Sequence, residues 1–144
     1  MNNQDIEILS YIRHNCRNSI TEMSRDFGLP VLEMMDRIKS YEKTYIKNYT
    51  CVLDFEKVGL KVDSYLKLEI DVKEKKSFER FISNCKPVNS IFIIEDGKYL
   101  IECLFREEIV LNKFIEKMKR NFTIIELEVL RVKREIKREV FLDS

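Results

Sequence analysis

Glycine, proline and histidine are scarce in this sequence of 144 residues, which has three glycines, two prolines, one histidine and no tryptophan. So few glycines and prolines exclude a flexible or low-complexity linker. The single histidine, His14, cannot build a metal site or a catalytic triad with other histidines, and at the end of a helix it is expected to be a surface or capping residue. Carboxylate pairs at catalytic spacing are also missing. We therefore predict no cofactor, no metal and no enzymatic activity.

Long apolar runs are missing as well. No stretch of about 18 apolar residues marks a transmembrane helix, and the first residues, MNNQDIEIL, lack the basic and apolar blocks of a signal peptide. The four cysteines are far apart and form no CxxC pair. We expect a cytoplasmic protein with reduced thiols and without disulfides or zinc; a redox-sensing thiol is the alternative. The cysteines are Cys16, Cys51, Cys85 and Cys103.

Neither sign of charge is in excess. Charged residues make up 35% of the sequence, yet the net charge is +1, and the first 50 residues carry as many acidic as basic side chains. Because phosphate neutralisation supplies most non-specific affinity for DNA, any DNA binding is expected to be modest unless assembly multiplies the contacts. Hydrophobic residues make up 44%, enough for the core of one ordinary domain or two small ones.

In the first 45 residues, apolar side chains recur at intervals of three and four residues. This spacing predicts helices over 3–14, 20–26 and 31–43. The stretch SITE, Ser19 to Glu22, fits the capping box that begins a helix. Gly28 can take a positive φ and turn the chain between the last two helices. Three short helices with such a turn predict a helix-turn-helix module. The expected inward residues are Ile6, Ile8, Leu9, Ile12, Ile20, Met23, Phe27, Met34, Ile38 and Tyr41.

Beyond residue 45 the period changes to two, which is typical of strands. YIKNYTCVLD (45–54) predicts a strand, and FEKVGLKVD (55–63) predicts a linker. We predict further strands at 64–72, 88–95, 99–105 and 123–136, and helices at 75–85 and 107–120, with a DGK turn at 96–98. The order βαββαβ is that of the ferredoxin-like unit.

A helix-turn-helix, a connecting strand and a ferredoxin-like unit resemble the Lrp/AsnC (feast/famine) family of prokaryotic transcription regulators over essentially the whole chain. The first half is similar to the family pattern D..IL..L..n.R.s..ELS...GlS...V..RI..LE..G.I..Y. The matching residues are Asp5, Ile8, Leu9, Asn15, Arg17, Glu22, Met23, Ser24, Gly28, Leu29, Met34, Arg37, Ile38, Tyr41, Glu42, Ile46 and Tyr49.

The resemblance implies an α+β protein with a winged or plain helix-turn-helix DNA-binding domain over 1–50, a linker strand over 51–62, and a ferredoxin-like sensing and dimerisation domain (the RAM type) over 63–144. It implies that the partners are double-stranded DNA, further copies of the chain in a dimer, tetramer or octamer, and a small-molecule effector such as an amino acid, with no membrane. A dimer would place two recognition helices in successive major grooves.

Three features depart from the family pattern. Pro30 stands where a Ser or Thr usually caps the recognition helix. The family's LE..G.I becomes YEKTYI, without the glycine and one residue shorter. The family's G-x-x-D turn near the ligand becomes EDGKY, with Lys98 at the position of the acid. The effector residues that the resemblance implies are Asp96, Gly97, Lys98 and Tyr99.

If Met34, Ile38 and Tyr41 face the core, helical spacing turns most other residues of 31–40 outward, where they are candidates for contacting DNA. Apolar groups can touch thymine methyl groups, a carboxylate can accept from cytosine, and lysines and hydroxyls can contact phosphates. Arg37 is interpreted as a structural ion-pair partner instead. The predicted DNA-binding residues are Ser19, Thr21, Val31, Leu32, Glu33, Met35, Lys39, Lys43 and Lys47, and Asp36 and Ser40 also face outward.

Two alternatives remain open at the level of the sequence. The acidic and apolar outer face of 31–36 also suits a degenerate family member that senses small molecules or mediates assembly without reading DNA. Some decarboxylases of haem biosynthesis share the two-part architecture, but they are expected to carry histidine and arginine clusters, and this chain has no histidine after His14. The final run RVKREIKREV (131–140) is interpreted as a solvated strand or tail, with an accessory nucleic-acid contact as the alternative, and its Val132, Ile136 and Val140 as residues that extend the sheet or swap onto a partner.

Overall fold

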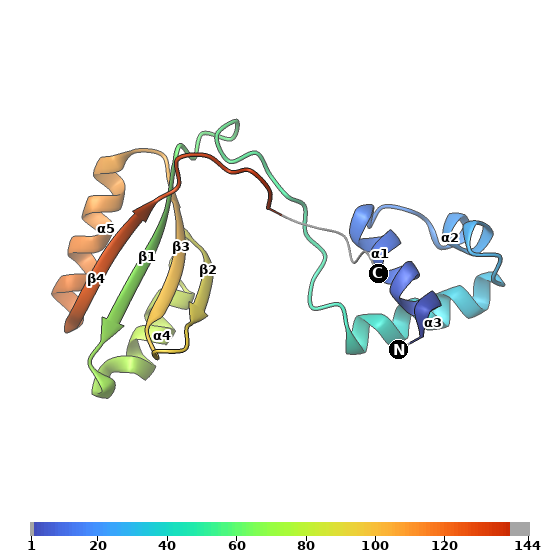
Figure 1. The fold of residues 1–144 in the computed structure, drawn as a ribbon, viewed down its shortest axis with the longest axis horizontal. Coiled ribbons are helices and arrows are strands. Elements are labelled where there is room, and N and C mark those ends of the chain that lie inside the picture. Colours follow the sequence, from blue (N-terminus) through green and yellow to red (C-terminus); the bar gives the residue numbers. More distant parts are fainter. Residues whose placement is uncertain (1, 139–144) are drawn as a thin grey trace. The chain divides into compact units, whose positions relative to one another are not determined.

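The chain divides at residue 52 into two compact units, one helical and one mixed α/β (Figure 1). This computed structural model describes residues 2–138. No helix among those residues is long and apolar enough to cross a membrane. Residues 139 and 140, the end of the charged run singled out above, lie outside the described part.

The helical unit consists of α1 (Asn3–His14), α2 (Ile20–Asp26) and α3 (Val31–Thr44). The first two helices have the predicted bounds, and α3 ends one residue later than predicted. The starts of α1 and α2 each carry a local signal in the sequence. Ser19 caps α2 through the capping box with Glu22, and Asn2 and Asp5 form a second capping box at α1. The buried core of the unit is Ile8, Leu9, Ile12, Met23, Met34, Ile38 and Tyr41.

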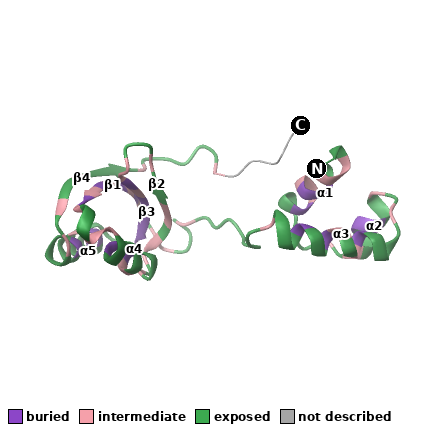
Figure 2. Cartoon of the chain, turned by 90° about the horizontal axis from the view of Figure 1, so that it is seen from below, coloured by how far each residue is buried: buried purple, intermediate pink, exposed green. Residues whose placement is uncertain are grey.

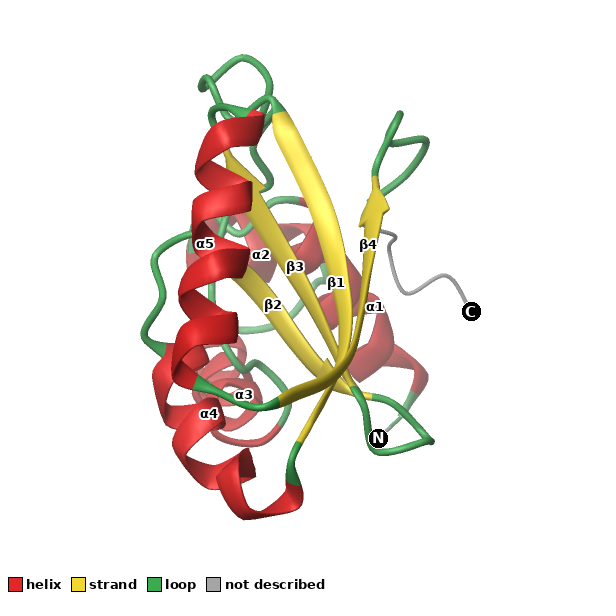
Figure 3. Cartoon of the chain, turned by 90° about the vertical axis from the view of Figure 1, so that its left-hand side faces the viewer, coloured by secondary structure: helices red, strands yellow, loops and turns green. Residues whose placement is uncertain are grey.

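The second unit contains β1 (Val62–Ile70), the 3-10 turn η1 (Val72–Glu74), α4 (Lys75–Ser83), β2 (Val88–Ile93), β3 (Tyr99–Phe105), α5 (Glu108–Asn121) and β4 (Ile124–Arg131). The four strands form one antiparallel sheet in the order β2-β3-β1-β4. Helices α4 and α5 cover one face of this sheet (Figures 2 and 3). This is the predicted βαββαβ arrangement, with its core between the sheet and the helices.

Strict alternation along β1 places Leu66, Leu68 and Ile70 in that core, and the partner positions on β3 add Tyr99 and Ile101. From the helices, the buried contributions are Phe78, Ile82, Leu111, Phe114 and Met118. Burying this apolar face is what holds the sheet and the two helices together.

The predicted strand at 45–54, and with it the linker strand at 51–62, is wrong. Residues 46–54 carry no strand pairing, residues 55–59 form a turn, and β1 begins only at Val62. Extended backbone becomes a strand only when a neighbouring strand takes up its hydrogen bonds. Here Ile46 instead donates its amide to the Tyr41 carbonyl (2.8 Å), and the helical unit also has no wing among its described residues.

The predicted last strand, 123–136, is also too long, because β4 ends at Arg131. Strand β4 pairs with β1, whose first residue is Val62. The last backbone hydrogen bond between the two segments runs from the Val132 amide to the Asp63 carbonyl. Beyond it, β1 offers no further partner. The residues after Val132 therefore do not extend the sheet within the described part of the chain.

Candidate nucleic-acid interface

A sharp turn joins α2 to α3 and sets the direction of α3. Gly28 adopts φ +62°, a conformation that side chains with a Cβ disfavour. The turn is closed by the Leu29 amide, which donates to the Ser24 carbonyl (3.0 Å), and by the Ser24 hydroxyl, which donates to the Leu29 carbonyl (2.5 Å). Phe27 and Leu29 pack against the core of the helical unit, so the turn is anchored on both sides of the glycine.

Helix α3 buries one face and exposes the other, as predicted. Met34, Ile38 and Tyr41 are buried in the core of the helical unit. Leu32, on the opposite face, is 71% exposed, and Val31, at the start of the helix, is 46% exposed. Pro30 stands at the N-cap and provides no side-chain cap, so the helix begins without the oxygen that a Ser or Thr would supply.

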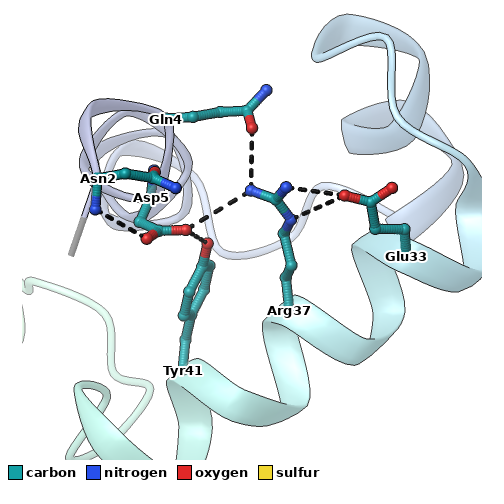
Figure 4. A network of polar contacts seen from close by, with 6 residues as sticks. All are labelled: Asn2, Gln4, Asp5, Glu33, Arg37 and Tyr41. Atoms are coloured by element: carbon teal, nitrogen blue, oxygen red, sulfur yellow. Dashed lines mark hydrogen bonds and ion pairs between the residues drawn. The ribbon is translucent and has the colours of Figure 1, made fainter.

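Arg37 occupies the centre of a polar cluster that ties α3 to the start of α1 (Figure 4). Its Nη2 lies 2.7 Å from Glu33 Oε1, and its Nη1 donates to Gln4 Oε1 at 2.9 Å and lies 3.6 Å from Asp5 Oδ1. The Tyr41 hydroxyl donates to the same Asp5 carboxylate at 2.6 Å. Arg37 is thus an ion-pair partner, in agreement with the interpretation from the sequence, and it links Glu33 of α3 to the start of α1.

The cluster alters the proton affinity of its members. Burial, and then the hydrogen bond to the Asp5 carboxylate, raise the pKa of Tyr41 to about 12. The Tyr41 hydroxyl, followed by the Asn2 amide, lowers the pKa of Asp5 below its ordinary value. The bond to Glu33 raises the pKa of Arg37. All three groups therefore stay in the protonation states that the contacts require at neutral pH.

The sequence did not reveal this cluster as a whole. Asp5 and Tyr41 are 36 residues apart, and Gln4 and Arg37 are 33 apart. The only local signals were the spacing of Asn2 and Asp5, which fits a capping box, and the spacing of Glu33 and Arg37, which suits an ion pair on one helix. Neither signal says that α1 and α3 meet at their polar ends.

The residues predicted to contact DNA are placed on two helices and the segment after them. Ser19 caps α2, and its hydroxyl is bonded to Glu22, whereas Thr21 is exposed in the first turn of the same helix. Lys39 and Lys43 are exposed on α3, Met35 is half-buried, and Lys47 is exposed beyond the helix. Val31, Leu32 and Glu33, described above, are exposed in the first turn of α3, and Leu32, Lys39 and Lys43 share one stripe of the helix.

The predicted effector residues lie at the β2–β3 turn but point in different directions. Gly97 takes φ +75° in the turn, and the Asp96 carboxylate accepts from the Lys98 amide at 3.1 Å. The Lys98 side chain bonds Glu126 of β4 at 2.5 Å, and this contact, before any other cause, raises its pKa. Tyr99 is buried in the core, where its hydroxyl donates to Glu79 of α4 at 2.7 Å. The side chains of Lys98 and Tyr99 are thus committed to contacts within the fold.

Two hollows beside α1 were not predicted. One has a volume of about 490 Å³ and the other of about 310 Å³, and Ile12, Cys16 and Tyr49 border both. Tyr49 is held by a bond from its hydroxyl to Glu42 (3.1 Å). The segment after α3 forms part of the wall, and the alternating pattern that predicts a strand there gives no sign of a hollow.

The cysteines are free thiols, with Cys16 and Cys51 exposed and Cys103 buried. Burial raises the pKa of Cys103 to about 12, which makes it a poor nucleophile. Within residues 2–138, no group of three or more His, Cys, Asp or Glu side chains is placed to hold a metal ion.

Comparison with known proteins gives distant relatives of one kind. No family model matches the chain. An uncharacterized HTH-type transcriptional regulator of Pyrococcus furiosus is 27% identical over 123 residues, which are 80% of this chain and 77% of the relative.

Solved structures match over nearly the whole length. A transcriptional regulator of Neisseria meningitidis, in complex with L-Met, has a TM-score of 0.88 and 21% identity, and covers 99% of this chain and 96% of its own. AsnC of E. coli has a TM-score of 0.86 and 17% identity, and covers 99% of both chains. The resemblance to the Lrp/AsnC regulators predicted from the sequence is therefore confirmed in the fold: the chain has their helix-turn-helix and their ferredoxin-like unit.

Proposed function

We propose that the protein is a sequence-specific, DNA-binding transcription regulator of the Lrp/AsnC type, acting as a dimer or a larger assembly in the cytoplasm without catalysing a reaction. The observation that supports this most directly is the α2–turn–α3 geometry, in which Gly28 and the Ser24–Leu29 bonds hold α3 with one face buried and the other open to a ligand. In a helix-turn-helix the second helix enters the major groove with its first residues toward the bases.

The basic residues of α3 suggest that its first turn contacts bases and its later turns contact phosphates. Leu32, Lys39 and Lys43 are separated by seven and four residues, so they follow one stripe of the helix. The lysines lie toward the end of α3, where they suit contacts with phosphates, and Thr21 offers a hydroxyl from α2. Because the helical unit has no basic excess, we expect several modules on one particle to supply affinity together.

Binding to DNA across a salt series tests this proposal. The purified protein is titrated against DNA from its own upstream region and against a scrambled duplex of the same composition. A preference of about tenfold or more for its own DNA at physiological salt supports sequence reading. Equal weak binding to both duplexes would contradict it and favour the degenerate family member that senses or assembles without reading DNA.

A matched pair of lysine variants tests the placement of α3. Lys39→Ala with Lys43→Ala is expected to weaken binding to both duplexes and to lower the salt slope by roughly two for each protomer, since each phosphate contact contributes about 0.9. Lys113→Ala, an exposed lysine on α5 in the other unit, is the control and is expected to change neither quantity. Sedimentation of the same samples gives the size of the assembly.

The second unit is the candidate sensor. The Neisseria meningitidis structure with the same fold is a complex with L-Met, which supports a small-molecule effector such as an amino acid for this chain too. Lys98 departs from the family pattern at the β2–β3 turn and is bonded to Glu126. Melting of the protein with each of the twenty amino acids, L-Met included, tests for a ligand, and a Lys98→Asp variant tests whether the turn takes part.

A further inference from the structure

Helix α3 presents an apolar surface at the end that a helix-turn-helix places against the bases. Pro30, Val31 and Leu32 are consecutive and all exposed, and Met35, half-buried, lies one turn after Val31. An exposed leucine alone needs no explanation, but here four apolar residues adjoin on the surface of a short helix.

The nearby side chains that could form hydrogen bonds with base edges are already paired or have unsuitable chemistry. Glu33 follows Leu32 directly, but its carboxylate is paired with the Arg37 guanidinium of the same helix at 2.7 Å (Figure 4). Asp36, one turn after Leu32, is a carboxylate that can only accept hydrogen bonds, most suitably from the amino group of cytosine, and it repels phosphates. The lysines that follow are one and two turns further along the same stripe, at the end better placed for phosphates.

The major groove offers one apolar group, the 5-methyl group of thymine. Resting on the function proposed above, we propose that the protein selects its DNA sites through thymine methyl groups that pack against Val31 and Leu32, with Met35 behind them. Leu32 is the principal specificity-determining residue because it is the most exposed of the three. The operator is therefore expected to carry thymines at the positions that face the start of α3, in each half-site.

The size of the effect follows from the group that is buried. Enclosing one methyl group is worth about 0.8 kcal/mol, which corresponds to about a fourfold change in affinity. A dimer that packs one such methyl group in each half-site is expected to lose about sixteenfold when both are removed, if the two half-sites are independent.

The test uses the full-length protein and synthetic duplexes. Sites are first enriched from a random duplex pool. Thymines in the enriched sites are then replaced by deoxyuridine, which removes the methyl group and leaves the base-pairing hydrogen bonds intact. We expect a loss of about fourfold for each critical thymine, and we expect Leu32→Ala to lose most of this discrimination, because Val31 alone remains against the methyl group. Ile109→Ala removes an exposed aliphatic side chain from α5, 55% exposed against 71% for Leu32; this variant is the control and is expected to keep the discrimination.

The outcomes separate this proposal from the one on which it rests. If no site is enriched, sequence reading fails and the methyl proposal fails with it. If sites are enriched but uracil binds as well as thymine, or if Leu32→Ala keeps the full penalty, the protein reads DNA by other groups and the methyl proposal alone is overturned. Enriched sites with a thymine penalty that depends on Leu32 support both.

Discussion

Replacing Gly28 by alanine should destabilise the helical unit through backbone strain alone. At φ +62° a Cβ built on Gly28 meets no heavy atom within 4 Å, so the substitution creates no clash. The left-handed conformation costs a residue with a Cβ about 1–2 kcal/mol. Alanine also restricts the unfolded chain, which offsets roughly 0.4–1 kcal/mol. The net loss is therefore expected to be about 1 kcal/mol.

The assay is hydrogen–deuterium exchange of the intact protein, followed by mass spectrometry. Peptides from α2 and α3 report the stability of the helical unit, while peptides from β1 and β3 provide an internal reference. Gly28→Ala should speed exchange in α2 and α3 about fivefold, the equivalent of about 1 kcal/mol, and leave the reference peptides unchanged. Its affinity for DNA should fall by no more than the loss of folded population explains.

Two further substitutions test whether the left-handed conformation of Gly28 is the cause. Gly28→Asn should cost much less than Gly28→Ala, because asparagine tolerates the left-handed region. Gly59→Ala introduces the same strain at φ +87° in the connecting segment, where a Cβ again meets nothing within 4 Å, and should leave α2 and α3 unaffected. If asparagine costs as much as alanine, or if alanine costs nothing, the turn is not held in the left-handed conformation and the argument from its geometry is wrong.

Three further predictions concern charge. Arg37→Met should release Glu33 toward the DNA and weaken binding, and adding Glu33→Gln should restore part of the affinity; if the double variant binds no better, the effect of Arg37 is structural only. Val31→Lys with Glu33→Lys should strengthen binding to every duplex and steepen the salt slope by up to about 2 for each protomer, while the preference among sites falls. Because the folded pKa of Asp5 lies below 3.8, its contribution to stability is complete above that pH and is lost as the pH falls through the folded value; exchange in α1 and α3 should therefore rise in this acid window, and Asp5→Asn should remove the dependence.

The helices could be predicted because their signals are local. The bounds of α1 and α2 followed from the apolar period and, for α2, from the Ser19–Glu22 capping box, all within a few residues of chain. The exposed face of α3 followed from the same period. The order of strands and helices in the second unit could be predicted for the same reason, since alternation and helical spacing are read within single segments.

The errors arose where a distant partner decides the structure. The alternating pattern of 45–54 describes side chains, but a strand also needs a neighbour for its backbone, and no alternation supplies one. The final strand stops at Arg131 because β1 begins at Val62, a limit set about 70 residues earlier in the chain. The same holds for the bond between Tyr41 and Asp5, which depends on how α1 packs against α3.

Counting charges in the sequence also gave a misleading picture of the outward face of α3. The acidic and basic residues of the helical unit cancel in number, and two acids, Glu33 and Asp36, stand on the outer face predicted for 31–36. The structure pairs Glu33 with Arg37 at 2.7 Å and places Arg37 3.6 Å from Asp5 of α1. That pairing neutralises one carboxylate with one guanidinium, although the Glu33 side chain stays 45% exposed. What is left along the stripe of α3 is an apolar first turn, one acid and two lysines, and on such a surface apolar contact with the bases can decide the site while the lysines supply the attraction.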